Sequence, residues 1–207
     1  VISSIKIRNP KNIYEHIQRL EYILATFIRK LMSKIDTLHI TPGVLSVYRT
    51  NLIRRLGGFD ENNITEDLEI ALRLRANNYS VKMSPDSITY TKVPSTFKQL
   101  WNQRIRWFRG FIFNNLKYKK MFMNKKYGLM GKFQLPLNAL TFFTIIILFI
   151  VIAYEAITRL YELIFRVFLL KSNIFYSLNL PSLKGLLLNT NIKLFFPLTV
   201  SFLLSFY

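Results

Sequence analysis

The sequence predicts a basic α/β domain over residues 1–132, followed by a membrane-spanning region over residues 133–207. Along the first part, segments with the alternation of strands take turns with segments of helical periodicity, which is typical of an α/β layer. This part holds 24 of the 29 basic and nine of the 11 acidic side chains. The second part opens with a run of 22 residues, 133–154, that contains no charged side chain.

The elements of the first part follow from local patterns. Residues 1–7 alternate apolar and polar side chains as a strand does, and residues 11–34 repeat apolar side chains at helical spacing. A turn at 41–43 leads into a short strand or helix, and the glycine pair at 57–58 indicates a tight turn. We further expect a helix over 65–76, strands over 79–83 and 87–91 joined by a turn at Ser84-Pro85-Asp86, and a helix from about Thr96.

The uncharged run 133–154 is long enough to cross a bilayer, because about 20 helical residues span the hydrocarbon core. A buried core helix is the alternative, but few soluble helices are apolar on all sides over this length. The preceding residues, 117–132, carry six lysines and no acid, whereas the charges that follow, Glu155, Arg159, Glu162 and Arg166, cancel. The positive-inside rule therefore predicts an integral protein of the cell membrane whose basic part is cytoplasmic, with lysines on anionic lipid.

The two ends of the sequence suggest a piece of a longer protein. The chain begins at Val1, and a second apolar segment, about 194–207, stops after 14 residues, which is too short to cross. We therefore expect a fragment whose second span is truncated.

The net charge of +18 predicts an anionic partner, whether nucleic acid, lipid headgroups or a phosphorylated substrate. The sign of the charge does not choose among these. The chain has no cysteine, which excludes disulfides and thiolate metal sites.

Five of the 11 acids crowd into residues 60–69, "DENNITEDLE". One interpretation is local: Thr65 caps a helix, and Glu66 and Asp67 lie in its first turn, where the helix dipole and the cap stabilise by about 1 kcal/mol. The other interpretation is a general base, because a carboxylate at a rigid helix start can take a proton from a hydroxyl. The like charges of Glu66 and Glu69 would raise its proton affinity, and nearby arginines would lower it.

The helix that begins near Thr96 presents two faces. Its apolar stripe, predicted to be the core face, consists of Phe97, Trp101, Ile105, Phe108 and Ile112. Gln103, Arg106 and Trp107 lie one turn apart away from that stripe. Trp107 either contacts another part of the protein or the membrane interface, or it forms with its neighbours a site for a sugar carrying a phosphate. Gly110, one turn on, lets a ligand or backbone approach closely.

These motifs in this order resemble the membrane-bound family-two glycosyltransferases, which include cellulose, chitin, hyaluronan and poly-N-acetylglucosamine synthases. The motifs on which the resemblance rests are Thr65-Glu66-Asp67, then the pattern Q-x-x-R-W at Gln103, Arg106 and Trp107, then the apolar run 133–154. "TPGVLSVYR" and "LGGFDE" are similar to the segments that precede the first motif. The resemblance covers about residues 1–155 and implies the C-terminal half of a GT-A type domain followed by transmembrane helices.

The resemblance implies an inverting, processive hexosyltransferase that moves a sugar from a nucleotide-diphosphate sugar to a growing polysaccharide. Asp67 would be the catalytic base, and Thr65 and Glu66 would belong to the substrate site. Gln103 and Arg106 would hold the diphosphate, Trp107 would stack on the acceptor sugar, and Arg104 matches an additional arginine of many members. Its partners would be the nucleotide sugar, a glycan or lipid-linked acceptor and membrane lipids, and nucleic acid is not expected.

One departure from the family pattern concerns the metal. The family binds Mg²⁺ or Mn²⁺ through a D-x-D motif, and no D-x-D occurs in this sequence. We therefore expect the metal ligands in a missing N-terminal half, assign none to this chain, and expect the fragment to be inactive alone. Two alternatives stay open: transfer of a single sugar to a lipid, and a non-catalytic, basic, membrane-anchored binding module.

Overall fold

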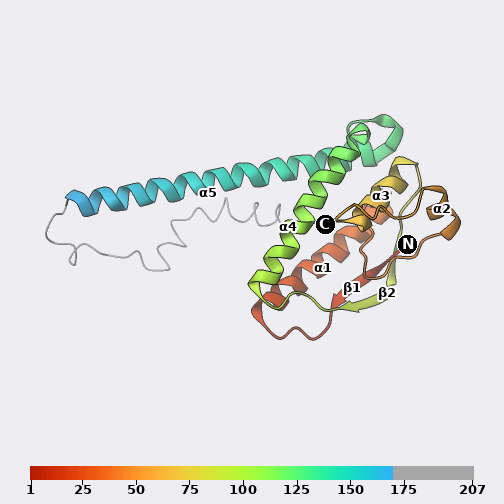
Figure 1. Ribbon diagram of the computed structural model, residues 1–207, viewed down its shortest axis with the longest axis horizontal. Helices are drawn as coiled ribbons and strands as arrows, with labels where there is room; N and C mark the ends of the chain where they lie inside the picture. The colour runs from red at the N-terminus through yellow and green to blue at the C-terminus, as the bar shows by residue number, and fades with distance from the viewer. Residues whose placement is uncertain (170–207) are drawn as a thin grey trace. The chain divides into compact units, whose positions relative to one another are not determined.

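The structure is a computed structural model and describes residues 1–169. The described chain forms two compact units, residues 1–138 and residues from 139 onward (Figure 1). The second apolar segment expected at about 194–207 lies outside the described residues.

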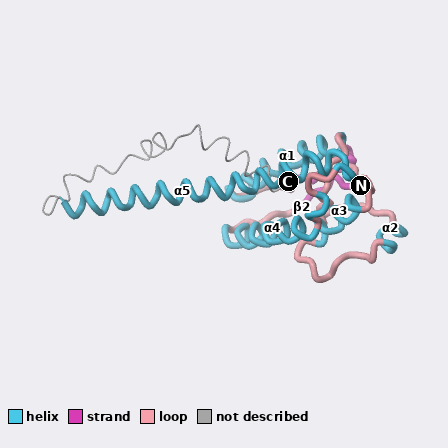
Figure 2. The backbone as a smooth tube through the Cα atoms, turned by 90° about the horizontal axis from the view of Figure 1, so that it is seen from above, coloured by secondary structure: helices cyan, strands magenta, loops and turns pink. Residues whose placement is uncertain are grey.

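The first unit contains a two-stranded parallel sheet, whose strand β1 is buried and whose strand β2 is mostly exposed. Strand β1 (Ile2–Ile7) pairs with β2 (Met83–Thr91), and in Figure 2 the strands make a small patch among helices and loops. The strand expected at 1–7 is confirmed. The hairpin expected around Ser84-Pro85-Asp86 is wrong, because the chain keeps its direction and the register moves from Ser3↔Ser84 to Ser4↔Ile88. The turn-like sequence forms a bulge, where a proline without an N–H is tolerated.

Helices account for most of the remaining described chain, and the helices expected at 11–34, 65–76 and from 96 are confirmed. Asn12 caps α1 by accepting a hydrogen bond from the Glu15 N–H at 3.0 Å, and Thr96 caps α4 by accepting from Gln99 at 3.4 Å. The elements are α1 (Ile13–Lys34), α2 (Thr50–Arg55), α3 (Glu66–Ala76), α4 (Phe97–Lys117), the short turns η1 (Lys119–Met121), η2 (Lys125–Tyr127) and the π-type turn η3 (Met130–Gln134), and α5 (Leu135–Leu169).

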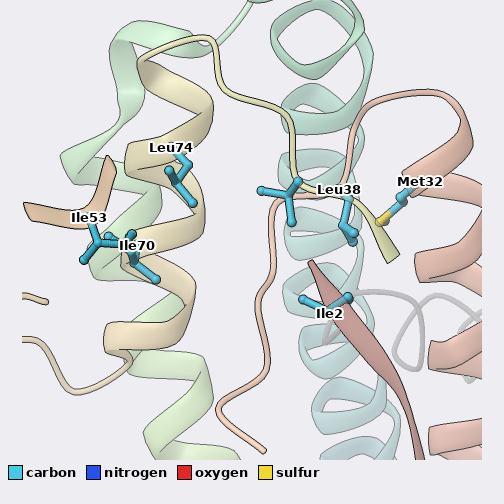
Figure 3. Packing of buried hydrophobic residues seen from close by; sticks show 7 residues of the cluster. Ile2, Met32, Leu38, Ile53, Ile70 and Leu74 are labelled. Carbon is cyan, nitrogen blue, oxygen red and sulfur yellow. The ribbon is translucent and has the colours of Figure 1, made fainter. Parts of the chain in front are cut away.

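The main core lies where α3 faces the start of β1. In Figure 3, Ile70 and Leu74 of α3 point toward Ile2 of β1 and toward Leu38, with Met32 of α1 on the far side. Ile2, Leu38 and Ile70 are each at most 1% exposed. Because α3 is held by this core along its length, its first turn has a fixed position relative to the sheet.

The α4 helix corrects one expectation. Its apolar stripe is not a core face: Phe97 is 60%, Trp101 56% and Ile105 40% exposed, whereas the buried residues of the helix are Gly110 and Asn114. The side predicted to face away from the core therefore faces the domain. Hydrogen bonds make this possible, because Asn114 finds partners that satisfy its amide inside the protein, and Phe111 adds apolar contact with the cluster that contains Leu68.

The α1 helix is turned in the same way. Its buried residues include Gln18, Glu21 and Arg29, and its exposed apolar stripe consists of Ile13, Ile17, Leu20, Ile23, Phe27 and Leu31. The buried Gln18 amide donates to the main-chain oxygens of Tyr14 at 3.0 Å and Pro94 at 2.8 Å. The inward faces of both helices therefore contain polar side chains, while Met32 of α1 joins the main core.

The α5 helix is longer than the predicted span of 133–154. It continues to Leu169, and Arg159 pairs with Glu155 one turn earlier at 2.7 Å, so these charges extend the helix. Within residues 1–169, one helical stretch, 130–165, is long and apolar enough to cross a membrane, and only 6% of its most apolar window is buried in the protein. Length and composition indicate membrane association.

Candidate active site

The start of α3 is fixed by a pair of buried amides. Asn63 donates from Nδ2 to Asn114 Oδ1 at 2.8 Å, and Asn114 donates from Nδ2 to Asn63 Oδ1 at 3.2 Å and to Thr65 Oγ1 at 2.9 Å. The Thr65 N–H donates to Asn63 Oδ1 at 3.1 Å. We call this arrangement the Asn63–Asn114 clamp. It joins α4 to the residue that precedes α3.

Thr65 occupies the N-cap position, as expected, but its side chain does not cap the helix. Its carbonyl accepts the first helical hydrogen bond from the Glu69 N–H at 3.0 Å, while its hydroxyl is used by Asn114. The capping role assigned to the Thr65 side chain is therefore wrong, because a buried amide on α4 competes for the same oxygen.

Gly110 permits the close approach of α4 to this point. A Cβ atom on Gly110 would lie 2.1 Å from Thr65 Oγ1 and 2.8 Å from Thr65 Cβ, so no other residue fits without movement. The expectation that Gly110 allows close approach is confirmed. The approaching group is the Thr65 side chain, not a ligand or backbone.

Asp67 lies half-buried in the first turn of α3 with hydrogen bonds on several sides. Its carboxylate accepts from the Leu68 N–H at 2.8 Å and from the Gly43 N–H, and its carbonyl accepts from Thr41 Oγ1 at 2.6 Å. Burial raises the pKa of Asp67 above its ordinary value, and the charge of Glu66 adds to the rise. The two N–H groups and the charge of Arg106 oppose it.

The expectation about neighbouring charges holds in part. Glu66 contributes to the raised pKa of Asp67, but burial is the largest cause, and Glu69 points elsewhere. The Glu69 side chain is fully buried and accepts hydrogen bonds from Arg73 at 2.5 Å, Lys117 at 2.8 Å and Tyr118 at 2.6 Å. Burial works against its charge, yet these three donors outweigh it and hold the pKa of Glu69 below its ordinary value. Glu69 therefore joins α3 to the end of α4.

One face of α4 turns toward this region. Gln103, Trp107, Gly110 and Asn114 are spaced by four, three and four residues, so they lie on a single helical stripe. Gln103 and Trp107 are half-buried, and Gln103 Oε1 has no hydrogen-bond partner although it is itself buried. A buried amide oxygen without a partner is uncommon and fits a group that a ligand completes.

The two arginines of the α4 motif differ in their surroundings. Arg106 is exposed, and its charge lowers the pKa of Asp67, which places the two groups within electrostatic reach. Arg104 forms an ion pair with Glu21 of α1, and its guanidinium lies 4.8 Å from the centre of the Trp107 ring. Arg104 therefore orients the indole and connects α4 to α1.

The structure thus brings Thr65 against the inward face of α4, with Glu66 exposed at the same helix start and Asp67 within electrostatic reach of Arg106. Sequence reasoning missed Asn63, Asn114 and Gly43. Asn114 had a signal, because it lies seven residues after Trp107 and so on the same face. Gly43 lay in the predicted turn and in the segment "TPGVLSVYR", but its contact with Asp67 joins residues far apart in the chain.

No metal centre is formed within residues 1–169, where no group of three or more His, Asp or Glu side chains comes together. The residues described here do not fit a divalent metal site, so no step below is assigned to a metal ligand of this chain.

The start of α3 thus lies against the helix that bears Gln103, Arg106 and Trp107, and comparison with known proteins gives the family of the chain. The family model for glycosyl transferase family group 2 matches residues 2–204. The chain belongs to this family, which confirms the resemblance to family-two glycosyltransferases and implies a GT-A fold.

Two similar relatives are both poly-beta-1,6-N-acetyl-D-glucosamine synthases, one from Staphylococcus epidermidis RP62A and one from Staphylococcus aureus COL. Each is 30% identical over 111 residues, which is 53% of this chain and 27% of the relative. The matched part of the chain therefore spans about a quarter of the relatives' length.

Proposed function

We propose that this chain is the acceptor-side part of an inverting glycosyltransferase that moves a hexose from a nucleotide-diphosphate sugar to a growing polysaccharide. The observation that carries the proposal is the contact between the start of α3 and the inward face of α4. The electrostatic effect of Arg106 on the half-buried carboxylate of Asp67 supports a site that these groups share with Gln103 and Trp107.

In the proposed reaction Asp67 is the general base. The acceptor hydroxyl oxygen attacks the anomeric carbon of the donor, the bond from that carbon to the diphosphate oxygen breaks, and the diphosphate leaves with the electron pair. Asp67 takes the proton of the attacking hydroxyl. A raised pKa supports this role because it gives the carboxylate a higher affinity for that proton, and the charge of Arg106 opposes the rise.

The residues of α4 supply binding in this proposal. Gln103 offers an unpartnered amide oxygen, which suits a hydroxyl or the N–H of an acetamido group as donor. The exposed guanidinium of Arg106 suits the diphosphate. Trp107, held from one side by Arg104, offers its ring to the apolar face of the acceptor sugar. Thr65 acts through position, since its side chain is engaged with Asn114.

We further propose N-acetylglucosamine as the sugar to test first, because the relatives' names contain it. Mg²⁺ or Mn²⁺ is expected to neutralise the leaving diphosphate, with its ligands outside this chain. The protein is placed in the cell membrane with its catalytic part in the cytoplasm, on the strength of the lysines at 117–132 and the apolar α5.

The test uses the full-length enzyme with UDP-N-acetylglucosamine as probe donor. Asp67→Asn should lower turnover by at least about 1,000-fold while donor affinity changes little, because it removes only the proton acceptor. Trp107→Ala should affect acceptor use more than donor KM. Wild-type turnover in Asp67→Asn would refute the assignment.

Two alternatives are outcomes of the same experiment. Polysaccharide synthesis would give a polymeric product. Transfer of one sugar to a lipid would give a single glycolipid instead. A non-catalytic module would instead bind anionic vesicles with a steep salt dependence and no effect of Asp67→Asn. This chain by itself is expected to show no turnover.

A further inference from the structure

An irregular segment between α1 and α2 is buried, although loops usually lie on the surface. Residues 37–43, which we call the 37–43 segment, have no helix or strand assignment. Thr37 and Leu38 are 0% exposed, His39 is 3% and Thr41 is 1%. Most buried polar groups find a partner, so the partners of this segment indicate what it holds in place, although the buried Thr37 hydroxyl has none.

The first half of the segment is fixed to the start of α5. His39 Nδ1 lies 3.0 Å from the Thr37 carbonyl and therefore carries the proton, which leaves Nε2 as an acceptor. Asn138 donates from Nδ2 to this Nε2 at 3.0 Å, and its Oδ1 accepts from Gln134 Nε2 at 2.9 Å. Each donor in this series of hydrogen bonds meets an acceptor when His39 is neutral. Burial favours the neutral form, because it lowers the pKa of His39 to about 4.

The second half of the segment is fixed to Asp67. Thr41 donates from Oγ1 to the Asp67 carbonyl at 2.6 Å, and the Gly43 N–H bonds to the Asp67 carboxylate. Between the two ends, Ile40 packs on the apolar cluster that contains Leu68 of α3 and Leu135 of α5. Three residues thus lie between His39, which contacts α5, and Gly43, which contacts the carboxylate.

We propose that His39 and Asn138 are positioning residues for the transfer reaction: through the 37–43 segment they tie the first turn of α5 to the main chain and carboxylate of Asp67. The proposal rests on the proposed function, in which Asp67 is the base. It adds that the helix predicted to enter the membrane also sets the geometry of the base, so that the site depends on how that helix is seated.

The physical basis is the shortness and burial of the connection. Residues 37–41 are buried or half-buried, with Leu38 and Ile40 packed in two clusters, and Gly43 at the end of the segment is exposed. The buried part moves as a unit, because protein interiors are packed as densely as crystals. Release of His39 from Asn138 should therefore shift Thr41 and Gly43, not only the residues beside His39. Misplacement of a catalytic group by about 1 Å can cost about 100-fold in rate.

The test compares three variants in the full-length enzyme in lipid nanodiscs, measured by turnover and by amide hydrogen exchange. Asn138→Leu removes the donor to His39 with little change in volume. Asn138→Asp is the conservative variant, because a carboxylate still accepts from Gln134 and can bond a protonated His39. Gln18→Leu is the matched control: it removes another buried amide of the same unit that has no contact with the 37–43 segment.

For Asn138→Leu we expect amide exchange at residues 41–43 to rise about 10-fold or more and kcat per folded molecule to fall about 10-fold, with donor KM within about twofold. The acidic limb of the kcat–pH profile should also move to higher pH, because the Gly43 N–H that lowers the pKa of Asp67 is displaced. Loss of folded protein would not move that limb. The other ionisable groups that change the pKa of Asp67 are Glu66 and Arg106, and both remain in place in this variant. The charge of Asp67 in turn raises the pKa of Tyr48.

Asn138→Asp should keep more activity than Asn138→Leu, and Gln18→Leu should leave exchange at 41–43 and the pH profile unchanged. Faster exchange confined to residues 37–39, with kcat per folded molecule intact, would overturn the proposal. Turnover retained by Asp67→Asn would overturn the proposed function and the catalytic part of this inference with it. Unchanged exchange at 41–43 in Asn138→Leu would overturn the link alone.

Discussion

The contact between Gly110 and Thr65 gives the sharpest test of the site geometry. In Gly110→Ala, the new methyl group would lie 2.1 Å from Thr65 Oγ1 and 2.4 Å from Thr65 Cγ2. Carbon atoms rarely come closer than 3.0 Å to such neighbours, so α4 and the start of α3 must separate by about 1 Å. The Asn63–Asn114 clamp spans the same gap and would be stretched with it.

The sign of the stability change in Gly110→Ala shows whether Gly110 is in contact with Thr65 or has free space around it. In a helix interior, alanine is more favourable than glycine by about 1 kcal/mol, so a Gly110 with free space around it would be stabilised by the change. Overpacking costs about 1–3 kcal/mol, which exceeds that gain. We therefore expect Gly110→Ala to lower the free energy of unfolding by about 1 kcal/mol and turnover by about 100-fold, since Asp67 and the α4 residues lose their register.

The assay is thermal denaturation and turnover of the full-length enzyme, with Asn102→Ala as control. Asn102 lies on the exposed side of α4, so this control changes the same helix without touching α3. A Gly110→Ala enzyme that is more stable than the parent and equally active would refute the reasoning, because it would show that α4 and Thr65 are not in contact.

The remaining predictions concern two buried ionisable groups. Glu69→Gln should lower the free energy of unfolding by about 3 kcal/mol, because Arg73 and Lys117 lose the negative charge with which they pair. The control Glu61→Gln changes an exposed side chain and should have little effect. Equal thermal midpoints for the two variants would contradict the ion-pair network around Glu69. Burial lowers the pKa of His39 to about 4 in the folded protein, whereas an unfolded histidine has a pKa of about 6.5. Between about pH 6.5 and 4 the unfolded chain therefore binds a proton that the folded chain does not bind. The free energy of unfolding should decrease as the pH is lowered, by about 2 kcal/mol from pH 7.5 to pH 5. His39→Gln should remove this slope in thermal denaturation at the two pH values, and an unchanged slope would assign it to other groups.

The local patterns of the sequence were enough to predict β1, α1, α3 and α4, because strand alternation, helical periodicity and capping residues act over a few neighbours. The motifs at 65–67 and 103–107 likewise identified the family without a structure. The prediction of a hairpin was wrong because the sequence Ser84-Pro85-Asp86 can form either a turn or a bulge. Parallel pairing with β1 is compatible with the bulge.

What only the tertiary structure decided is which side of α4 faces inward. The sequence determines an apolar and a polar face by spacing alone, and for a soluble helix the apolar face is the expected inner one. Here Gly110 and the Asn63–Asn114 clamp bury the polar face, because the hydrogen bonds of Asn114 and the close helix contact at Gly110 form there. That choice depends on Thr65 and Asn63, more than 40 residues away in the chain, and no window of the sequence contains it.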